Sequence, residues 1–242
     1  MASTGHTIRP FDEELDSLRG TICEMGGLAE QAIADAMAAL VRGDLEAAAL
    51  VVERDRRLDA LETEIEQQTV AIIADRAPAA DELREVVAAL KIAGVVERIG
   101  DYAKNIAKRV PSLEDSKIRP LSLLPEMARI AGEMVHNVLD AFAARDAARA
   151  RQVRDRDVAV DDFYNSIFRA LLTHMMENPH NITPATHLLF VARNLERIGD
   201  HATNIAEMVH FAATGQHLGD RARGADTTEI AADDIGNDPY GR

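Results

Sequence analysis

The sequence predicts an all-α protein built from two tandem three-helix bundles that are related by internal duplication. The first observation is a twelve-residue stretch, Val96 to Ala107, that returns as Leu195 to Ala206 with nine identical residues at an offset of 99. Identity over that length indicates a duplicated unit. The second observation is the recurrence of apolar residues every three to four positions, which is typical of amphipathic helices.

The composition agrees with tightly packed helices and limits the possible partners. Hydrophobic residues make up 47% of the chain and aromatic residues 4%, and tryptophan is absent. Such a chain favours helices that pack through small side chains. The formal net charge of −14 argues against nucleic acid or anionic lipid as the main partner, and it is compatible with metal cations or basic protein surfaces. With Cys23 as the only cysteine, a disulfide framework and a thiolate zinc site are excluded.

The sequence also predicts where the protein acts in the cell. Its first residues carry no basic region followed by an apolar stretch, so no secretory signal is expected. The longest apolar runs, such as residues 47–52, are too short to cross a bilayer. We therefore expect a cytoplasmic protein without direct membrane insertion.

The first repeat is predicted over residues 11–110, after a flexible N-terminus of residues 1–10. Residues 11–42 carry apolar side chains at spacings of three and four and predict a long first helix. Gly43 is expected to end this helix, because glycine readily adopts the left-handed conformation found after helix ends. Asp44 is then well placed to cap the second helix.

The second and third helices of this repeat are predicted to form a hairpin. The second helix continues to about Asp75, and Pro78 breaks the chain. Asp81 is expected to cap the third helix, which reaches about residue 109 and contains the first copy of the motif. Residues 111–120, which are bounded by prolines, predict a polar linker.

The same pattern then starts again and predicts the second repeat over residues 121–213. Three further helices are expected at about 121–144, 147–176 and 183–213, and the last of them contains the second copy of the motif. Residues 214–242 are rich in Gly and Asp and lack periodicity, which predicts a disordered acidic tail. No segment has the alternation typical of a strand.

Each copy of the motif places polar groups of one kind along one side of its helix. Two carboxylates four residues apart are followed by an amide one turn later: Glu97, Asp101 and Asn105 in the first copy, and Glu196, Asp200 and Asn204 in the second. Like charges at this spacing repel by a few tenths of a kcal/mol on an exposed helix. A cation between them would remove the repulsion.

The partner helix of each hairpin carries a matching pair of carboxylates. Asp55 and Asp59 precede the first turn. Because the two helices are antiparallel around that turn, Asp59 is expected opposite Glu97, and Asp55 opposite Asp101. The second repeat has the same arrangement, with Asp161 opposite Glu196 and Asp157 opposite Asp200.

Four carboxylates at one height predict a metal site in each repeat. Clustered carboxylates suit hard cations such as magnesium, calcium, manganese or iron, whereas zinc is less suited without His or Cys ligands. The predicted ligands are Asp55, Asp59, Glu97, Asp101, Asn105, Asp157, Asp161, Glu196, Asp200 and Asn204. The alternative is two acidic surface patches that are balanced by Arg98, Lys104 and Arg197.

Two other motifs carry less weight. Glu133 with His136, and Glu207 with His210, have the Glu-x-x-His spacing that supplies ligands in di-iron bundles. Neither pair is present at the matching positions of the other repeat. The sequence shows no nucleophile motif and no glycine-rich phosphate loop.

The duplicated Glu-Arg-Ile-Gly-Asp-x-Ala-x-Asn-Ile-Ala motif, near the end of each three-helix repeat, resembles the PhoU family of bacterial phosphate-signalling proteins. The resemblance covers residues 11–213. It implies a non-enzymatic negative regulator of the phosphate regulon that restrains phosphate uptake. It also implies an adaptor between the PstB-like ATPase subunit of the phosphate transporter and a PhoR-like sensor kinase, often as a homodimer.

The resemblance further implies that the (Glu/Asp)-x-x-x-Asp pairs carry divalent or trivalent metal ions such as iron, zinc, magnesium or manganese. Two other functions stay open on the residues alone. One is a carboxylate-bridged metalloenzyme, an oxidase or a hydrolase, on a helical bundle. The other is a purely structural helical protein.

Overall fold

The computed structural model describes residues 8–114, 118 and 122–219, with side chains from residue 12 onward. Over these residues the chain forms helices and no strand, which confirms the all-α prediction. The helices are α1 (Ile8–Arg42), α2 (Leu45–Arg54), α3 (Arg56–Arg76), α4 (Ala80–Ala107), α5 (Leu123–Ala144), α6 (Ala147–Glu177) and α7 (Ile182–Thr214), with short 3-10 turns η1 (Pro111–Leu113) and η2 (Pro179–Asn181). The predicted flexible N-terminus was too long, because residues 8–10 belong to α1, and its other residues lie outside the described part of the chain. The predicted linker and tail lie partly outside the described residues.

The boundary between the first and second helix of each repeat follows the predicted chemistry. Gly43 has φ 67°, and the Asp44 carboxylate accepts a hydrogen bond of 2.9 Å from the Ala47 N–H. At the equivalent place in the second repeat, Arg145 has φ 53° and Asp146 caps α6. Both turns therefore use a left-handed residue followed by an aspartate cap.

Three further boundaries differ from the prediction. The predicted second helix is divided at Asp55, whose carbonyl accepts from the Leu58 N–H at 2.9 Å, which is the tighter spacing of a 3-10 turn. Helix α4 starts at Ala80 because the Glu82 carboxylate, and not Asp81, satisfies a backbone N–H before the helix, that of Ala79. The tail was predicted from residue 214, but Thr214 is the last residue of α7. Residues 215–219 follow the helix, and the Gly219 carbonyl accepts a hydrogen bond from Arg154 on α6.

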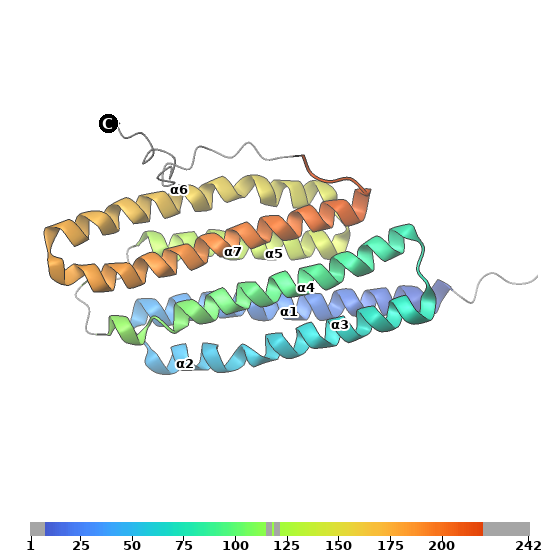
Figure 1. The fold of residues 1–242 in the computed structure, drawn as a ribbon, viewed down its shortest axis with the longest axis horizontal. Helices are drawn as coiled ribbons and strands as arrows, with labels where there is room; N and C mark the ends of the chain where they lie inside the picture. The colour runs from blue at the N-terminus through green and yellow to red at the C-terminus, as the bar shows by residue number, and fades with distance from the viewer. Residues whose placement is uncertain (1–7, 115–117, 119–121, 220–242) are drawn as a thin grey trace, which may run out of the picture.

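The seven helices lie side by side along one long axis (Figure 1). Helices α1, α4, α5 and α7 pack on one another in the centre, while α2 and α3 flank one edge and α6 flanks the other. Helices α4 and α7 run in opposite directions. As a result, the α3–α4 turn and the α6–α7 turn lie at opposite ends of the molecule.

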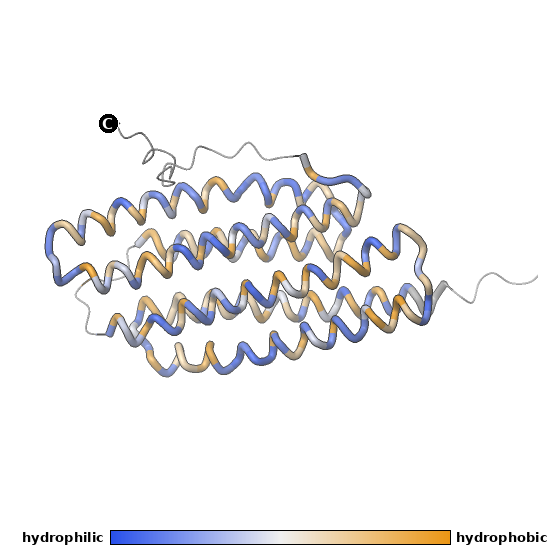
Figure 2. Tube along the Cα trace, viewed as in Figure 1, coloured by the Kyte–Doolittle hydropathy of each residue, from blue (hydrophilic) through white to orange (hydrophobic). Residues whose placement is uncertain are grey.

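Both repeats contribute to one continuous hydrophobic core. Ile22 and Met25 of α1, Ile99 of α4 and Ile198 of α7 are fully buried within it. Hydrophobic and hydrophilic positions alternate around each helix, as amphipathic packing requires (Figure 2). In the described part of the chain, no helix combines the length and the apolar character needed to cross a membrane.

Candidate functional site

A glycine in each motif lets the helices of a hairpin approach closely. A Cβ atom on Gly100 would lie 2.2 Å from Leu58 Cδ1, and one on Gly199 would lie 2.8 Å from Asp157 Oδ1. Neither gap can hold a methyl group without a shift of the neighbouring side chain. Glycine costs about 1 kcal/mol in a helix relative to alanine, and here it brings the carboxylates of the facing helix next to the motif.

The first cluster joins α3 to α4 through a lysine. Asp55, at the α2–α3 junction, is buried with 8% of its surface exposed, and Asp101 on α4 is half-buried. The Lys104 ammonium donates hydrogen bonds to both carboxylates. The structure thus places Asp55 opposite Asp101, as the hairpin register predicts. Asn105 is half-buried on the same helix.

The other end of the first cluster is crowded with negative charge. Burial, followed by the charges of Asp101, Glu62 and Asp59, raises the pKa of Glu97 to about 7. The pKa of Glu62 is also raised, first by burial and then by neighbouring carboxylates that include Asp59. Glu62 was not among the predicted residues. Its signal was available, because it lies seven residues after Asp55 and faces Gly94, which has no side chain to block it.

The second cluster repeats the carboxylates but uses arginines as partners. Asp157 is the most buried member, with 2% of its surface exposed, and Asp161 is half-buried. Burial, followed by the charge of Asp200, raises the pKa of Glu196 to about 7, although Arg193 and Arg197 act in the opposite direction. Arg193 donates to the Glu196 carboxylate at 2.6 Å.

The two copies of the motif meet at the centre of the molecule. Tyr102 of α4 and His201 of α7 occupy equivalent positions, and their ring centroids are 5.3 Å apart. Burial, followed by the charge of Arg98, lowers the pKa of His201. The Asn204 amide lies 3.3 Å from the His201 ring. Contact between equivalent residues means that the repeats are related by an approximate two-fold axis at this point.

Comparison with known proteins agrees with the duplicated motif. The PhoU domain family matches residues 22–110 and 124–209, which is one match in each repeat. The chain belongs to the PhoU family. A phosphate-specific transport system accessory protein PhoU homolog from Zymomonas mobilis is 55% identical over 92% of this chain and 94% of its own. A homolog of the same description from Rhizobium meliloti is 47% identical over 95% and 98% of the two chains.

Solved structures of PhoU proteins have the same fold. The crystal structure of PhoU from Pseudomonas aeruginosa superposes with a TM-score of 0.81 at 38% identity, over 85% of this chain and all of that one. The regulatory protein PhoU of the phosphate transport system from Streptococcus pneumoniae also gives 0.81, at 26% identity, over 86% and 99%. The two-repeat architecture is therefore that of PhoU.

The carboxylate clusters of this PhoU chain contain donor groups suited to a metal ion, together with cationic side chains. Carboxylate and amide oxygens are the donors that hard cations prefer. Among the described side chains, however, no three Asp, Glu, His or Cys residues are grouped so that they could hold a metal ion as they stand. In the first cluster the Lys104 ammonium lies between Asp55 and Asp101. The second cluster has Thr203 at the matching position, and Arg193 and Arg197 form ion pairs with its Glu196 and Asp200 carboxylates.

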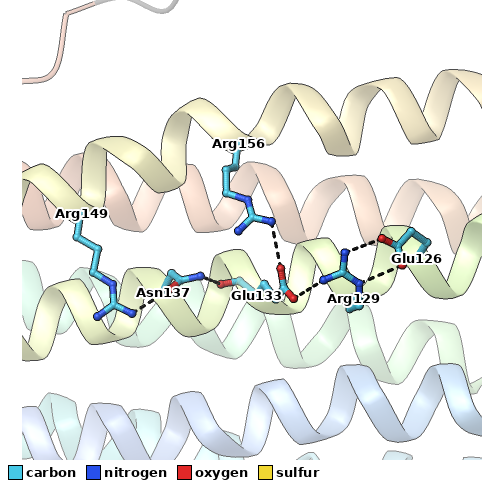
Figure 3. A network of polar contacts seen from close by, with 6 residues as sticks. All are labelled: Glu126, Arg129, Glu133, Asn137, Arg149 and Arg156. Carbon is cyan, nitrogen blue, oxygen red and sulfur yellow. Dashed lines mark hydrogen bonds and ion pairs between the residues drawn. The ribbon is translucent and has the colours of Figure 1, made fainter.

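The two Glu-x-x-His motifs do not lead into these clusters. Glu133 forms ion pairs with Arg129 and Arg156 in a network along α5 (Figure 3). His136 turns instead toward Glu30 of α1, at 3.2 Å. The motif carboxylate and imidazole therefore have separate partners.

The second of these motifs is divided between surface and interior. Glu207 is exposed, whereas His210 is buried and lies 3.0 Å from the Gln216 carbonyl oxygen. The two side chains therefore do not share an environment.

Proposed function

We propose that this chain is an adaptor that restrains phosphate uptake and acts as a negative regulator of the phosphate regulon. The observation that carries the proposal is the 55% identity, over 92% of the chain, to a relative named as an accessory protein of phosphate-specific transport. The proposal assigns the chain no chemical step and no enzymatic activity. Signal passes as a change in which partner is bound, because a ligand or partner shifts the balance between states.

The proposed partners are a PstB-like transporter ATPase subunit and a PhoR-like sensor kinase, contacted from the cytoplasm without insertion into the bilayer. Exposed apolar residues near the tips of the two hairpins support protein partners: Val70 and Leu83 in the first, Leu172 and Ile182 in the second. Protein interfaces bury such residues. We also propose a homodimer, from the family resemblance, and no nucleic-acid partner, because the formal net charge is −14.

We further propose that the carboxylate clusters bind iron, zinc, magnesium or manganese. The ligands would come from Asp55, Asp59, Glu97, Asp101 and Asn105 in the first repeat, and from Asp157, Asp161, Glu196, Asp200 and Asn204 in the second. When bound, the metal would supply positive charge that holds the two helices of a hairpin together. Burial and neighbouring carboxylates raise the pKa of Glu97 and of Glu196 to about 7, and a bound cation would favour the charged forms of both groups.

The adaptor role is tested in cells. Deletion of the gene should leave a phosphate-regulon reporter active in phosphate-replete medium, and the full chain should restore repression. Tagged full-length chain should also retain the transporter ATPase and the sensor kinase in a pull-down, with the tag alone as control. A deletion strain that still represses the reporter, or a chain that retains neither partner, would overturn the proposal.

The metal role is tested on purified protein. Elemental analysis of chain purified without chelator is compared with an Asp101→Ala/Asp200→Ala double variant. We expect metal in the wild type and its loss in the variant, with unchanged helicity. Metal in neither protein would remove the metal from the proposal and leave the adaptor standing. Dioxygen-dependent iron oxidation by the wild type would favour the metalloenzyme instead.

A further inference from the structure

A surface rich in aromatic rings and cations lies where the end of α4 meets the first half of α7, toward the α6–α7 turn (Figure 1). The whole chain holds only six Phe and three Tyr residues, and three of these rings gather here. We call this surface the aromatic–arginine patch, and its members are Lys108, Arg109, Tyr164, Phe168, Phe190 and Arg193. None of them is among the proposed metal ligands.

Two guanidinium groups of the patch are held in place by aromatic rings. Arg109, which follows α4, lies over the Phe190 ring of α7, with 4.7 Å between the guanidinium carbon and the ring centroid. Arg193 of α7 lies over the Tyr164 ring of α6 at 5.7 Å, and the Phe168 ring is 6.5 Å from that of Tyr164. Stacking fixes the plane of a guanidinium and leaves the N–H groups at its edge able to donate to a carboxylate.

The cations of the patch are only partly neutralised by the chain itself. Lys108 is exposed and Arg109 is half-buried, and neither forms an ion pair with any residue that the structure describes. Arg193 pairs with Glu196, but 46% of its side chain stays exposed. Phe190 is 47% exposed although its ring is large and apolar. In a chain of formal net charge −14, the patch is a local area of positive charge beside exposed apolar surface.

The first repeat has no such patch at the equivalent place. Two aromatic rings of the second repeat are replaced there by glutamates, the third by a lysine, and the arginine by a glycine. In order, Tyr164, Phe168, Phe190 and Arg193 correspond to Glu62, Glu66, Lys91 and Gly94. The two ends of the molecule therefore share a backbone arrangement but differ in chemistry, so a partner that fits one end does not fit the other.

We propose that the aromatic–arginine patch binds a carboxylate-bearing segment of one of the two proposed protein partners. This inference rests on the proposed adaptor function and deepens it, because it assigns a surface and a chemistry to one contact. Arginine and aromatic residues are enriched among the residues that carry most of the binding energy of an interface. A guanidinium donates two parallel hydrogen bonds to a carboxylate. The negative charge of the rest of the chain repels an acidic segment, so the patch also orients it.

The test measures binding of the purified full chain to the transporter ATPase subunit and to the detergent-solubilised sensor kinase by biolayer interferometry. Arg109→Glu reverses a charge of the patch, and it should weaken binding to one of the two partners by at least about tenfold and leave the other unchanged. Lys91→Glu is the matched control, because it makes the same change of charge at an exposed position of α4 outside the patch. It should behave as the wild type.

Two further variants separate stacking from charge. Phe190→Ala keeps every cation but removes the ring beneath Arg109, and it should weaken binding to the same partner about two- to fivefold. Arg109→Lys keeps the charge but loses the planar fork, and its loss should lie between those of the wild type and Arg109→Glu. Circular dichroism and Tm confirm that each variant is folded. Raising NaCl from about 0.1 M to about 0.5 M should weaken the wild type more than Arg109→Glu.

The outcomes separate the patch from the adaptor role beneath it. Wild-type affinity of Arg109→Glu for both partners would overturn the patch and leave the adaptor intact. An equal loss for both partners, or an equal loss in Lys91→Glu, would overturn it as well, because either would reflect net charge and not this surface. Self-association that Arg109→Glu abolishes, with both partners still bound, would assign the patch to a second copy and overturn the proposal. Binding of neither partner by the wild type would overturn both.

Discussion

The two repeats carry the same carboxylates but neutralise them in different ways. In the first, Lys104 bonds Asp55 and Asp101, while Glu62 adds a further negative charge beside Glu97. At the equivalent positions the second repeat has Thr203 and Tyr164, and Arg193 stands where the first has Gly94. Duplication has preserved the four paired acids of each repeat, whereas Glu62 and Lys104 have no counterpart in the second repeat. Sites of matching sequence are therefore not sites of matching charge.

The largest expected effect tests whether the repeats fold as one unit. Ile99→Ala and Ile198→Ala change equivalent residues that are both fully buried. Each should lower the free energy of unfolding by about 2–5 kcal/mol, because a large side chain leaves a cavity. Both should shift a single transition in urea, followed by circular dichroism, since the core is continuous. Two separate transitions, only one of them shifted, would mean that the repeats unfold independently.

The next effect compares the two kinds of cation. Lys104→Met should lower the free energy of unfolding by roughly 1–3 kcal/mol, because it leaves the buried Asp55 carboxylate without its partner. The loss is smaller than for a fully buried ion pair, because the Lys104 side chain is 21% exposed. Arg193→Met should cost only about 0–1 kcal/mol, because the arginine is 46% exposed. Urea unfolding with chelator present measures both. Equal losses would show that the repeats depend equally on their cations.

A smaller effect comes from the glycines that bring the helices together. Gly100→Ala and Gly199→Ala should each lower the free energy of unfolding by roughly 0.5–2 kcal/mol. Overpacking costs about 1–3 kcal/mol, and the higher helix propensity of alanine offsets about 1 kcal/mol of that cost. Gly132→Ala is the control, since a Cβ there meets nothing within 4 Å, and it should stabilise. Only Gly199→Ala displaces a carboxylate, that of Asp157, and it alone should weaken metal binding. An equal loss of metal in Gly100→Ala would contradict this.

The last effect is a dependence of stability on pH. The pKa of Glu97 and of Glu196 is raised from 4.5 to about 7 in the folded protein. The folded state then binds more protons than the unfolded state between these values, so that stability falls as the pH rises from 4.5 through 7. Tm measured against pH in chelator should show this decline, and Glu97→Gln and Glu196→Gln should each flatten it. A Tm that rises over the same range would refute the assignment.

Helices and their register could be predicted from the sequence because they follow from local periodicity and turn residues. Gly43 and Asp44 marked a helix boundary correctly, and the antiparallel register placed Asp55 opposite Asp101. The N-cap of α4 was predicted wrongly as Asp81, whereas it is Ala79. There the Glu82 side chain reaches back to the Ala79 N–H, and that choice between neighbouring acids depends on backbone geometry that the sequence does not specify.

The compensation within each cluster could not be predicted. Lys104 was assigned only to the balance of a surface patch, yet its ammonium bridges two helices. Whether a long side chain reaches across a hairpin depends on the interhelical distance, which Gly100 and Leu58 determine by direct contact. Glu62 is different, because its place seven residues after Asp55 and opposite Gly94 was a signal that the prediction did not use.

The two hairpin turns lie at opposite ends of the molecule (Figure 1), so the helices between them determine its length. Helix α7 has 33 residues and spans about 50 Å. Because α7 is one continuous helix, it holds the regions near the two turns at a fixed distance. A partner that contacts both turns would therefore have to present two surfaces at that spacing.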